Sequence, residues 1–197
     1  FKKNISNLVY LSEYFGLPEV AEYWNSIIKL NNWQKQRISK LIVQKLFGTL
    51  RGKSIAILGF AFKANTNDTR ESPAIDICKN LLEEGANLII HDPKVSEEQM
   101  TKNLGKKAYH ICKNQDSNDY ESTWTKNENI YSSLSGVDAV VILTEWDIYK
   151  NLDWEKISKL MRKPAWVFDT RGLVDVTTLK NTDLNFWKIG DGLEKKL

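Results

Sequence analysis

From Ser54 to the C-terminus, short apolar runs alternate with amphipathic segments. Alternation of this kind is typical of a parallel sheet whose strands are joined by right-handed helical crossovers. We therefore predict a doubly wound parallel α/β sheet over residues 51–197. The predicted strands are Ser54–Leu58, Asn87–His91, Ala139–Leu143, Ala165–Phe168 and Asn185–Lys188, and the predicted helices are Pro73–Glu84, Ser96–Leu104, Ile130–Leu134, Trp154–Met161 and Val176–Lys180. The polar segment Gly105–Asn127 lacks periodicity, so we expect an irregular insertion there.

Residues 1–50 have a different pattern and form a separate helical segment in this prediction. Pro18 follows Gly16, which predicts one helix over Ile5–Phe15 and a second from Pro18 to about Phe47. The second helix carries apolar residues at three- and four-residue steps over a length that the following sheet is not expected to cover. We therefore expect residues 1–50 to be an incomplete dimerisation segment and Glu19–Phe47 to pair in a homodimer or higher homo-oligomer.

Composition excludes several classes of protein. The net charge of +3 comes from interspersed lysines and carboxylates, so we expect no nucleic-acid partner. No apolar run is long enough to span a bilayer and no secretory signal opens the chain, which favours a cytoplasmic protein without a membrane partner. The two cysteines have no metal-ligand spacing, and we expect no metal. Cys78 lies in an apolar stripe and is interpreted as a buried structural thiol, whereas Cys112 is given no role.

The polar loop Gly59–Ala74 follows the first predicted strand and precedes a helix. Ligands bind at this end of such strands, where helix N-termini present N–H groups to anions. Lys63 and Arg70 add positive charge, while hydroxyl donors come from three further residues, Thr66, Thr69 and Ser72. Asp68 either orients Arg70 or caps the helix. The alternative is a solvated loop in which Asp68 and Arg70 merely pair with each other.

The absence of a glycine-rich pattern limits the class of ligand that this loop can bind. Gly59 is the only glycine between Lys53 and Gly85, so the glycine-rich dinucleotide fingerprint is missing. We therefore expect a mononucleotide or a sugar nucleotide, with Phe60 or Phe62 available to stack on a ring.

Three positions after later strands are candidates as well. Asp92 stands where a dinucleotide fold keeps its ribose-binding acid, although it could equally hold a turn. Arg171, in Phe168-Asp169-Thr170-Arg171, should emerge at the same sheet edge as Lys63 and grip an anion. The segment Thr144–Asp147 is interpreted as a helix N-cap with a packed tryptophan.

GFAFKANTNDTRESPA at residues 59–74 closely resembles the signature of the UDP-glucose/GDP-mannose dehydrogenase family. Further matches keep the family's order along the chain: NLVYL at 7–11, LPEVAEYW at 17–24, HDPKV at 91–95, TEWD at 144–147 and FDTR at 168–171. The resemblance implies a Rossmann-like UDP-binding domain. It also implies a parent enzyme that oxidises a nucleotide sugar in two hydride transfers to NAD, through a thiol-bound intermediate.

The resemblance assigns roles to individual residues. Phe62, Lys63 and Arg171 would bind the nucleotide sugar. Arg70 would contact NAD, and Phe1, Lys2 and Lys3 would border this cofactor. The family's catalytic cysteine would directly precede Phe1 and its N-terminal NAD domain would lie upstream, so the 197 residues are expected to be inactive by themselves. Asn4 stands where the family has an aspartate, and an amide cannot accept a proton as a carboxylate does.

The resemblance leaves the substrate open. The extended matches LPEVAEYW and TEWD favour family members that act on UDP-glucose. The alternatives are relatives that act on UDP-N-acetylmannosamine or GDP-mannose, and a non-catalytic module that binds a nucleotide sugar or dimerises.

Overall fold

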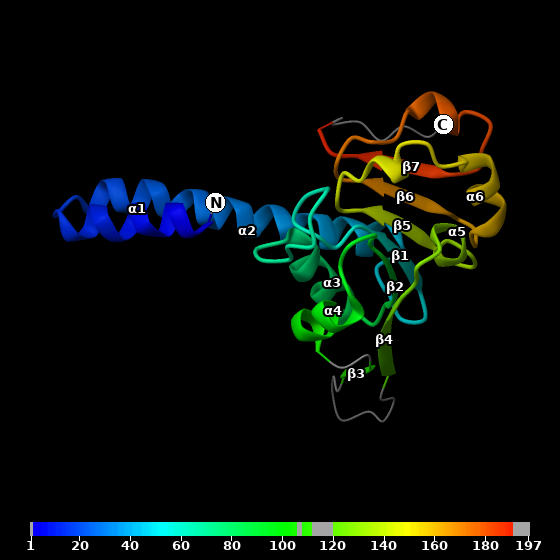
Figure 1. Ribbon diagram of the computed structural model, residues 1–197, viewed down its shortest axis with the longest axis horizontal. Coiled ribbons are helices and arrows are strands. Elements are labelled where there is room, and N and C mark those ends of the chain that lie inside the picture. The colour runs from blue at the N-terminus through cyan, green and yellow to red at the C-terminus, as the bar shows by residue number, and fades with distance from the viewer. Residues whose placement is uncertain (1, 106–107, 112–119, 191–197) are drawn as a thin grey trace.

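The computed structural model describes residues 2–105, 108–111 and 120–190. In this part of the chain, seven strands form one sheet in the order β3-β4-β2-β1-β5-β6-β7 (Figure 1). The strands are β1 (Ser54–Leu58), β2 (Asn87–His91), β3 (Ala108–Ile111), β4 (Tyr120–Lys126), β5 (Ala139–Ile142), β6 (Trp166–Asp169) and β7 (Asn185–Lys188). All neighbours from β4 to β7 pair in parallel, and only β3 runs antiparallel, beside β4. The predicted parallel α/β sheet is confirmed.

Helices cover both faces of this sheet. In Figure 1, α3 and α4 lie on one side of the strands and α5 and α6 on the other, as a doubly wound fold requires. Their bounds are α3 (Pro73–Glu83), α4 (Glu97–Leu104), α5 (Ile130–Ser133) and α6 (Trp154–Leu160), with 3-10 turns η1 (Asp147–Tyr149) and η2 (Val176–Leu179). The last predicted helix is therefore a 3-10 turn.

The prediction of an irregular insertion at Gly105–Asn127 is wrong, because this segment contains β3 and β4. β4 pairs in parallel with β2. Its inward positions include Trp124 and Ser122, both fully buried, and the Ser122 hydroxyl donates to Leu82 O at 3.0 Å. A strand with one tryptophan and one serine facing the core lacks the aliphatic run by which the other strands were identified. Cys112, to which the sequence assigned no role, lies outside the described residues.

α1 (Lys2–Tyr14) and α2 (Pro18–Lys45) form an antiparallel hairpin that projects from the sheet (Figure 1). Pro18 opens α2 in its first turn, as predicted, and Gly16 supplies the positive φ of the connection at +69°. With 28 residues, α2 is about 42 Å long. No helix of the described residues is both long enough and apolar enough to cross a lipid bilayer.

The C-terminal half of α2 belongs to the core of the α/β unit. Ile38, Ile42 and Leu46 are buried in one cluster with the strands and with α3. Lys35 Nζ also pairs with Asp76 Oδ2 of α3 at 2.5 Å. The expectation that the sheet leaves this whole apolar stripe to a partner is therefore wrong for its C-terminal half.

Candidate ligand site

The start of the loop after β1 is fixed by hydrogen bonds from its backbone to the buried carboxylate of Asp92. Asp92 Oδ2, at the end of β2, accepts hydrogen bonds from Phe60 N at 2.7 Å and Ala61 N at 2.9 Å. Phe60 is fully buried as a result, so its expected stacking role is wrong. Phe62 is 40% exposed and remains available to stack on a ring.

Asp92 itself is fully buried, and both of its carboxylate oxygens accept hydrogen bonds. Oδ1 accepts from Lys94 N at 2.9 Å and Val95 N at 3.0 Å, and Oδ2 also accepts from Trp146 Nε1 at 3.2 Å. A carboxylate with these partners has no oxygen to offer a ribose hydroxyl. The ribose-binding interpretation of Asp92 is wrong, and the turn-holding interpretation is confirmed.

Gly59 is required where the loop leaves β1. Its φ is +94°, and a Cβ built there would lie 2.4 Å from Thr144 Cβ. Only glycine fits both the backbone conformation and the space. The Thr144 hydroxyl donates to Ala61 O at 2.7 Å, so it does not cap a helix. The helix N-cap predicted in the segment Thr144–Asp147 is wrong, because the 3-10 turn η1 begins there without a side-chain capping hydrogen bond. The predicted packing of Trp146 is confirmed by an exposed fraction of 5%.

The middle of the loop presents Arg70, which is fixed by Asp68. The guanidinium donates to both carboxylate oxygens, with Nη2 2.8 Å from Oδ2 and Nε 3.0 Å from Oδ1. These hydrogen bonds from Arg70 are the main reason why the pKa of Asp68 falls to about 2. Asp68 therefore pairs with Arg70, which agrees both with a role in orienting Arg70 and with the alternative of a solvated loop. Ser72 is the residue that caps α3, through its Oγ and Ala74 N.

The three loop hydroxyls mainly stabilise the loop itself. Ser72 Oγ donates to Phe60 O at 2.8 Å, so its proton is not available to an anion. Thr66 Oγ1 accepts from Asp68 N, and Thr69 Oγ1 accepts from Asn103 Nδ2 of α4. The expectation that Ser72 donates to a ligand is therefore wrong.

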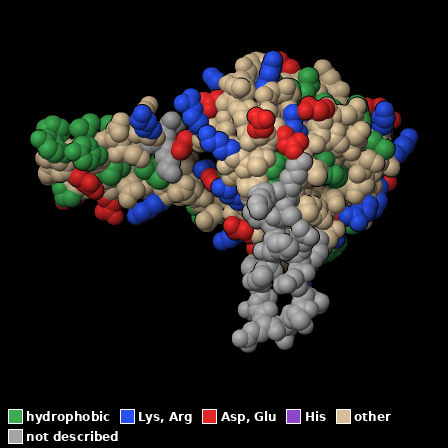
Figure 2. All heavy atoms as spheres, turned by 60° about the horizontal axis from the view of Figure 1, so that its bottom comes forward, with side chains coloured by type: hydrophobic (Ala, Val, Ile, Leu, Met, Phe, Trp, Pro, Cys, Tyr) green, Lys and Arg blue, Asp and Glu red, His purple; other side chains and the backbone are tan. Residues whose placement is uncertain are grey.

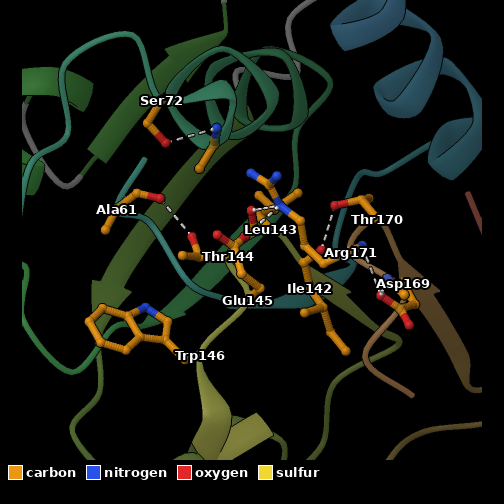
Figure 3. A network of polar contacts seen from close by, with 12 residues as sticks. Ala61, Ser72, Ile142, Leu143, Thr144, Glu145, Trp146, Asp169, Thr170 and Arg171 are labelled. Carbon is orange, nitrogen blue, oxygen red and sulfur yellow. Dashed lines mark hydrogen bonds and ion pairs between the residues drawn. The ribbon is translucent and has the colours of Figure 1, made fainter. Parts of the chain in front are cut away.

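Arg171 follows β6, where Asp169 shapes the turn. Asp169 is fully buried and accepts from three backbone N–H groups, those of Arg171, Gly172 and Val174, at 2.7–2.9 Å. Arg171 Nε donates to Leu143 O at 2.7 Å, across the end of β5 (Figure 3). Its terminal nitrogens make no hydrogen bond among the described residues. Guanidinium groups presented in this way bind phosphates and carboxylates.

These residues surround a cavity of about 840 Å³ between the helical hairpin and the carboxyl edge of the sheet. Cations contribute from four elements, as Lys3, Lys35, Arg70 and Arg171. Phe62 contributes an aromatic ring, and the apolar lining consists of Ile5, Ile28, Ile38, Pro73, Ile77, Leu143 and Ile189. A mostly apolar cavity of this size with a few convergent charges is typical of a small-molecule site.

The cavity gathers some of the predicted site residues and leaves others out. Phe62, Arg70, Arg171 and Lys3 line it. Lys63 is exposed and does not line it. Asn4 lies exposed on α1, also outside the lining. Phe1 and the side chain of Lys2 lie outside the described residues.

The sequence prediction missed one wall of the cavity. α2 contributes Lys35 and three amide side chains, those of Asn31, Asn32 and Gln34. Polar residues beside Ile28 and Ile38 could have indicated this wall, but the helix was interpreted only as a partner interface. Among the described residues, no group of three or more His, Cys, Asp or Glu side chains could hold a metal ion.

Comparison with known proteins gives a consistent result. Residues 56–176 match the model of the UDP-glucose/GDP-mannose dehydrogenase family, UDP binding domain. The chain is 43% identical over 198 residues to UDP-glucose 6-dehydrogenase 4 of Arabidopsis thaliana and equally to UDP-glucose 6-dehydrogenase 1 of Glycine max. Each alignment covers 98% of this chain and 41% of the relative. The chain therefore spans about two fifths of the length of these relatives.

A solved structure gives a similar match at lower identity. The UDP-glucose dehydrogenase of the hyperthermophilic archaeon Pyrobaculum islandicum superposes with a TM-score of 0.65 at 29% sequence identity. The superposition covers 87% of this chain and 33% of the archaeal chain.

Proposed function

Because the chain belongs to the UDP-glucose/GDP-mannose dehydrogenase family, we propose that it is the C-terminal, UDP-sugar-binding part of an NAD-dependent UDP-glucose 6-dehydrogenase. The whole enzyme would convert UDP-glucose to UDP-glucuronate in two hydride transfers to NAD. The relatives at 43% identity are named as UDP-glucose 6-dehydrogenases, which favours this substrate over UDP-N-acetylmannosamine or GDP-mannose. The alternative is a non-catalytic module that binds a nucleotide sugar or dimerises, and it differs from the enzyme in having neither an NAD domain nor a catalytic cysteine.

The observation that carries the proposal is the position of Arg171 in the lining of the cavity. Its Nε is held by Leu143 O, and its terminal nitrogens are available to a diphosphate. Phe62 lies in the same lining and offers a face for a sugar or base to stack on. Lys63 is exposed nearby and adds to the positive potential without lining the cavity.

In the whole enzyme, NAD would be held mainly by the N-terminal NAD domain that the resemblance implies. The sheet has no glycine-rich phosphate loop, and Asp92 is committed to its turn, so the described residues do not form a dinucleotide site of their own. When bound, NAD accepts the hydride. From this chain, Arg70 and Lys3, which line the cavity, would border NAD. The resemblance implies the same role for Phe1 and Lys2. The Arg70 guanidinium is 88% exposed and oriented by Asp68, as such a contact requires.

Calorimetry with UDP-glucose, UDP and GDP tests the nucleotide site directly. We expect UDP-glucose to bind, and Arg171→Ala to lose roughly 1.5–3 kcal/mol of binding free energy per charged hydrogen bond. Lys63→Ala tests the role that the resemblance assigns to Lys63, and its effect should be smaller. Lys180→Ala removes an exposed cation outside the lining and is the matched control.

The outcomes separate the alternatives. Tighter binding of GDP than of UDP would favour a GDP-sugar enzyme. Equal binding by the wild type, Arg171→Ala and Lys180→Ala would contradict the assignment of Arg171.

We further propose that two copies of the chain associate through the exposed face of α2. The chain would then divide, as expected from the sequence, into a helical dimerisation segment and an α/β domain. The packing of Ile38 into the core favours a boundary inside α2 rather than at residue 50. Figure 2 shows hydrophobic side chains gathered at the far end of the hairpin, and five exposed residues belong to this end: Tyr10, Leu11, Tyr14, Phe15 and Leu17.

The interface on α2 is a narrow stripe with a charge pattern. Tyr23, Leu30 and Trp33 recur at seven- and three-residue steps and are 62%, 63% and 54% exposed. Glu19 and Glu22 lie exposed before this stripe, and Arg37 and Lys40 lie exposed after it.

An antiparallel pairing of two α2 helices satisfies this charge pattern. It would bring Glu22 opposite Arg37 of the second copy and Glu19 opposite Lys40. Both pairs are centred on the same point, between Lys29 and Leu30, as a two-fold axis requires.

Charge reversal tests this register. Glu22→Lys and Arg37→Glu should each weaken the dimer in sedimentation, and the double variant should restore it. Glu13→Lys reverses an exposed charge on α1 and is the control. A monomeric wild type, or a double variant no better than either single one, would contradict the register. Ile38→Glu is unsuitable because Ile38 is only 3% exposed and belongs to the core.

A further inference from the structure

We propose that Glu145 is a positioning residue that holds the guanidinium of Arg171 toward the cavity. The inference rests on the proposed function of Arg171 in binding an anionic nucleotide. Glu145 belongs to the segment 144–147, for which the sequence indicated only a helix cap and a packed tryptophan.

The two side chains meet where β5 and β6 end. Arg171 Nε lies 2.7 Å from Leu143 O and 3.4 Å from Glu145 Oε2 (Figure 3). Arg171 lines the cavity and Glu145 does not, so the carboxylate supports the guanidinium without lining the cavity. The hydrogen bond and the closest approach of the ion pair both involve Nε, and the two terminal nitrogens make no hydrogen bond among the described residues, so they can donate to a ligand.

The position of Glu145 is unfavourable for one of its carboxylate oxygens. Its Oε2 is buried and has no hydrogen-bond donor among the described residues. A buried carboxylate oxygen without a donor is unfavourable, and most such atoms in native proteins find a partner. The charge of Arg171 is what compensates Oε2 here.

The residues on both sides of Glu145 are held in place by hydrogen bonds of their side chains. Thr144 Oγ1 donates to Ala61 O, after β1, at 2.7 Å. Trp146 Nε1 donates to Asp92 Oδ2, at the end of β2, at 3.2 Å. Glu145 is therefore presented to Arg171 from a segment that is tied to two other strand ends.

This arrangement favours bidentate binding of a phosphate. An arginine side chain has several rotamers to lose on binding, and one that is already held at Nε loses fewer. The charge of Glu145 opposes a bound anion, but the guanidinium lies between the carboxylate and the cavity. We therefore expect the smaller loss of side-chain entropy of Arg171 on binding to outweigh the electrostatic repulsion between Glu145 and the anion.

Glu145→Gln tests the proposal with little change in shape. In the wild type, the Arg171 Hε proton should exchange slowly with solvent, because Nε donates to Leu143 O and the charge of Glu145 holds the guanidinium in the position where this bond forms. In Glu145→Gln, NMR should detect exchange that is at least about tenfold faster. The matched control is Asp147→Asn, two residues along, whose carboxylate is 81% exposed and pairs with Lys150. It should leave the exchange rate unchanged.

Calorimetry with UDP supplies the second measurement. Glu145→Gln should raise the dissociation constant about fivefold in the wild-type background and leave it unchanged in the Arg171→Ala background. Equal weakening in both backgrounds, tighter binding by Glu145→Gln, or unchanged Hε exchange would overturn the positioning role. If the wild type binds no UDP, the proposed function fails, while the exchange measurement still decides whether Glu145 positions Arg171.

Discussion

The indole of Trp146 donates a hydrogen bond from Nε1 to Oδ2 of Asp92, at 3.2 Å, and so joins the segment after β5 to the end of β2. The same oxygen accepts from the backbone at the start of the loop that carries Phe62 and Arg70. One buried carboxylate thus sets the relative position of three strand ends at the cavity.

Asp92→Asn should destabilise the fold strongly. An asparagine keeps one acceptor oxygen but directs an NH2 group at backbone N–H donors, which leaves buried polar groups unsatisfied. We expect a loss of about 3 kcal/mol in the free energy of unfolding, and a fall of roughly 6–12 °C in the melting temperature. Asp68→Asn is the control, since its partner Arg70 is exposed and the loss should be small. Similar melting temperatures for the two variants would contradict the role of Asp92.

Gly59→Ala should cost more stability than Gly136→Ala. Both glycines have a positive φ, +94° and +71°, so each substitution strains the backbone. Only at Gly59 does the added Cβ meet Thr144, whereas nothing lies within 4 Å at Gly136. Denaturant unfolding should place Gly136→Ala about 1–2 kcal/mol below the wild type, and Gly59→Ala at least about 2 kcal/mol lower again. Equal losses would show that the close approach to Thr144 relaxes at no cost.

The sequence predicted the strands that contain a continuous run of apolar residues. β1, β2 and β7 have the predicted bounds, because their apolar runs lie between clear turn residues. β3 and β4 were missed for lack of such a run. The choice between Phe60 and Phe62 could not be made either. Both are aromatic and lie in one loop, and which of them faces the core depends on the loop's path, which is fixed by the backbone hydrogen bonds that Asp92 accepts from Phe60 N and Ala61 N.

The site residues that directly follow a strand could be predicted from the sequence, whereas those whose position depends on loop or helix packing could not. Arg171 follows a strand directly, and the carboxyl ends of parallel strands meet at one edge, so its place in the cavity could be anticipated. Lys63 lies further into the loop, and its direction depends on the loop's internal hydrogen bonds, such as Phe62 N to Asp68 O at 2.8 Å. The wall formed by α2 depends on how the hairpin lies against the sheet, which no local pattern reveals.

The fold should lose stability as the pH falls below about 6.5, because of His91. Burial lowers the pKa of His91 from its ordinary value of 6.5, and its Nδ1 lies 2.9 Å from the Tyr149 hydroxyl. The unfolded chain therefore binds a proton before the folded chain does. The contribution of neutral His91 is complete above pH 6.5 and is lost as the pH falls toward the lowered pKa.

Urea unfolding at several pH values between about 5.5 and 7.5 measures this effect. The window lies above the pKa of Asp68, which is about 2, so that carboxylate does not contribute. His91→Asn should reduce the pH dependence. A wild type whose stability is constant over this window would contradict the prediction.

The 197 residues by themselves should not reduce NAD with UDP-glucose, because the described residues offer no suitable thiol at the cavity. A thiol-bound intermediate needs an accessible cysteine whose thiolate forms near neutral pH. Cys78 is fully buried on α3, and burial raises the pKa of its thiol far above the ordinary value. It lies among core residues and does not line the cavity. The absorbance of NADH should therefore stay constant when NAD and UDP-glucose are added to the purified chain. Alkylation of a Cys112→Ser variant is the accompanying control, and Cys78 should react only as fast as the protein unfolds. Measurable turnover, or rapid alkylation of folded Cys78, would refute this account of the thiols.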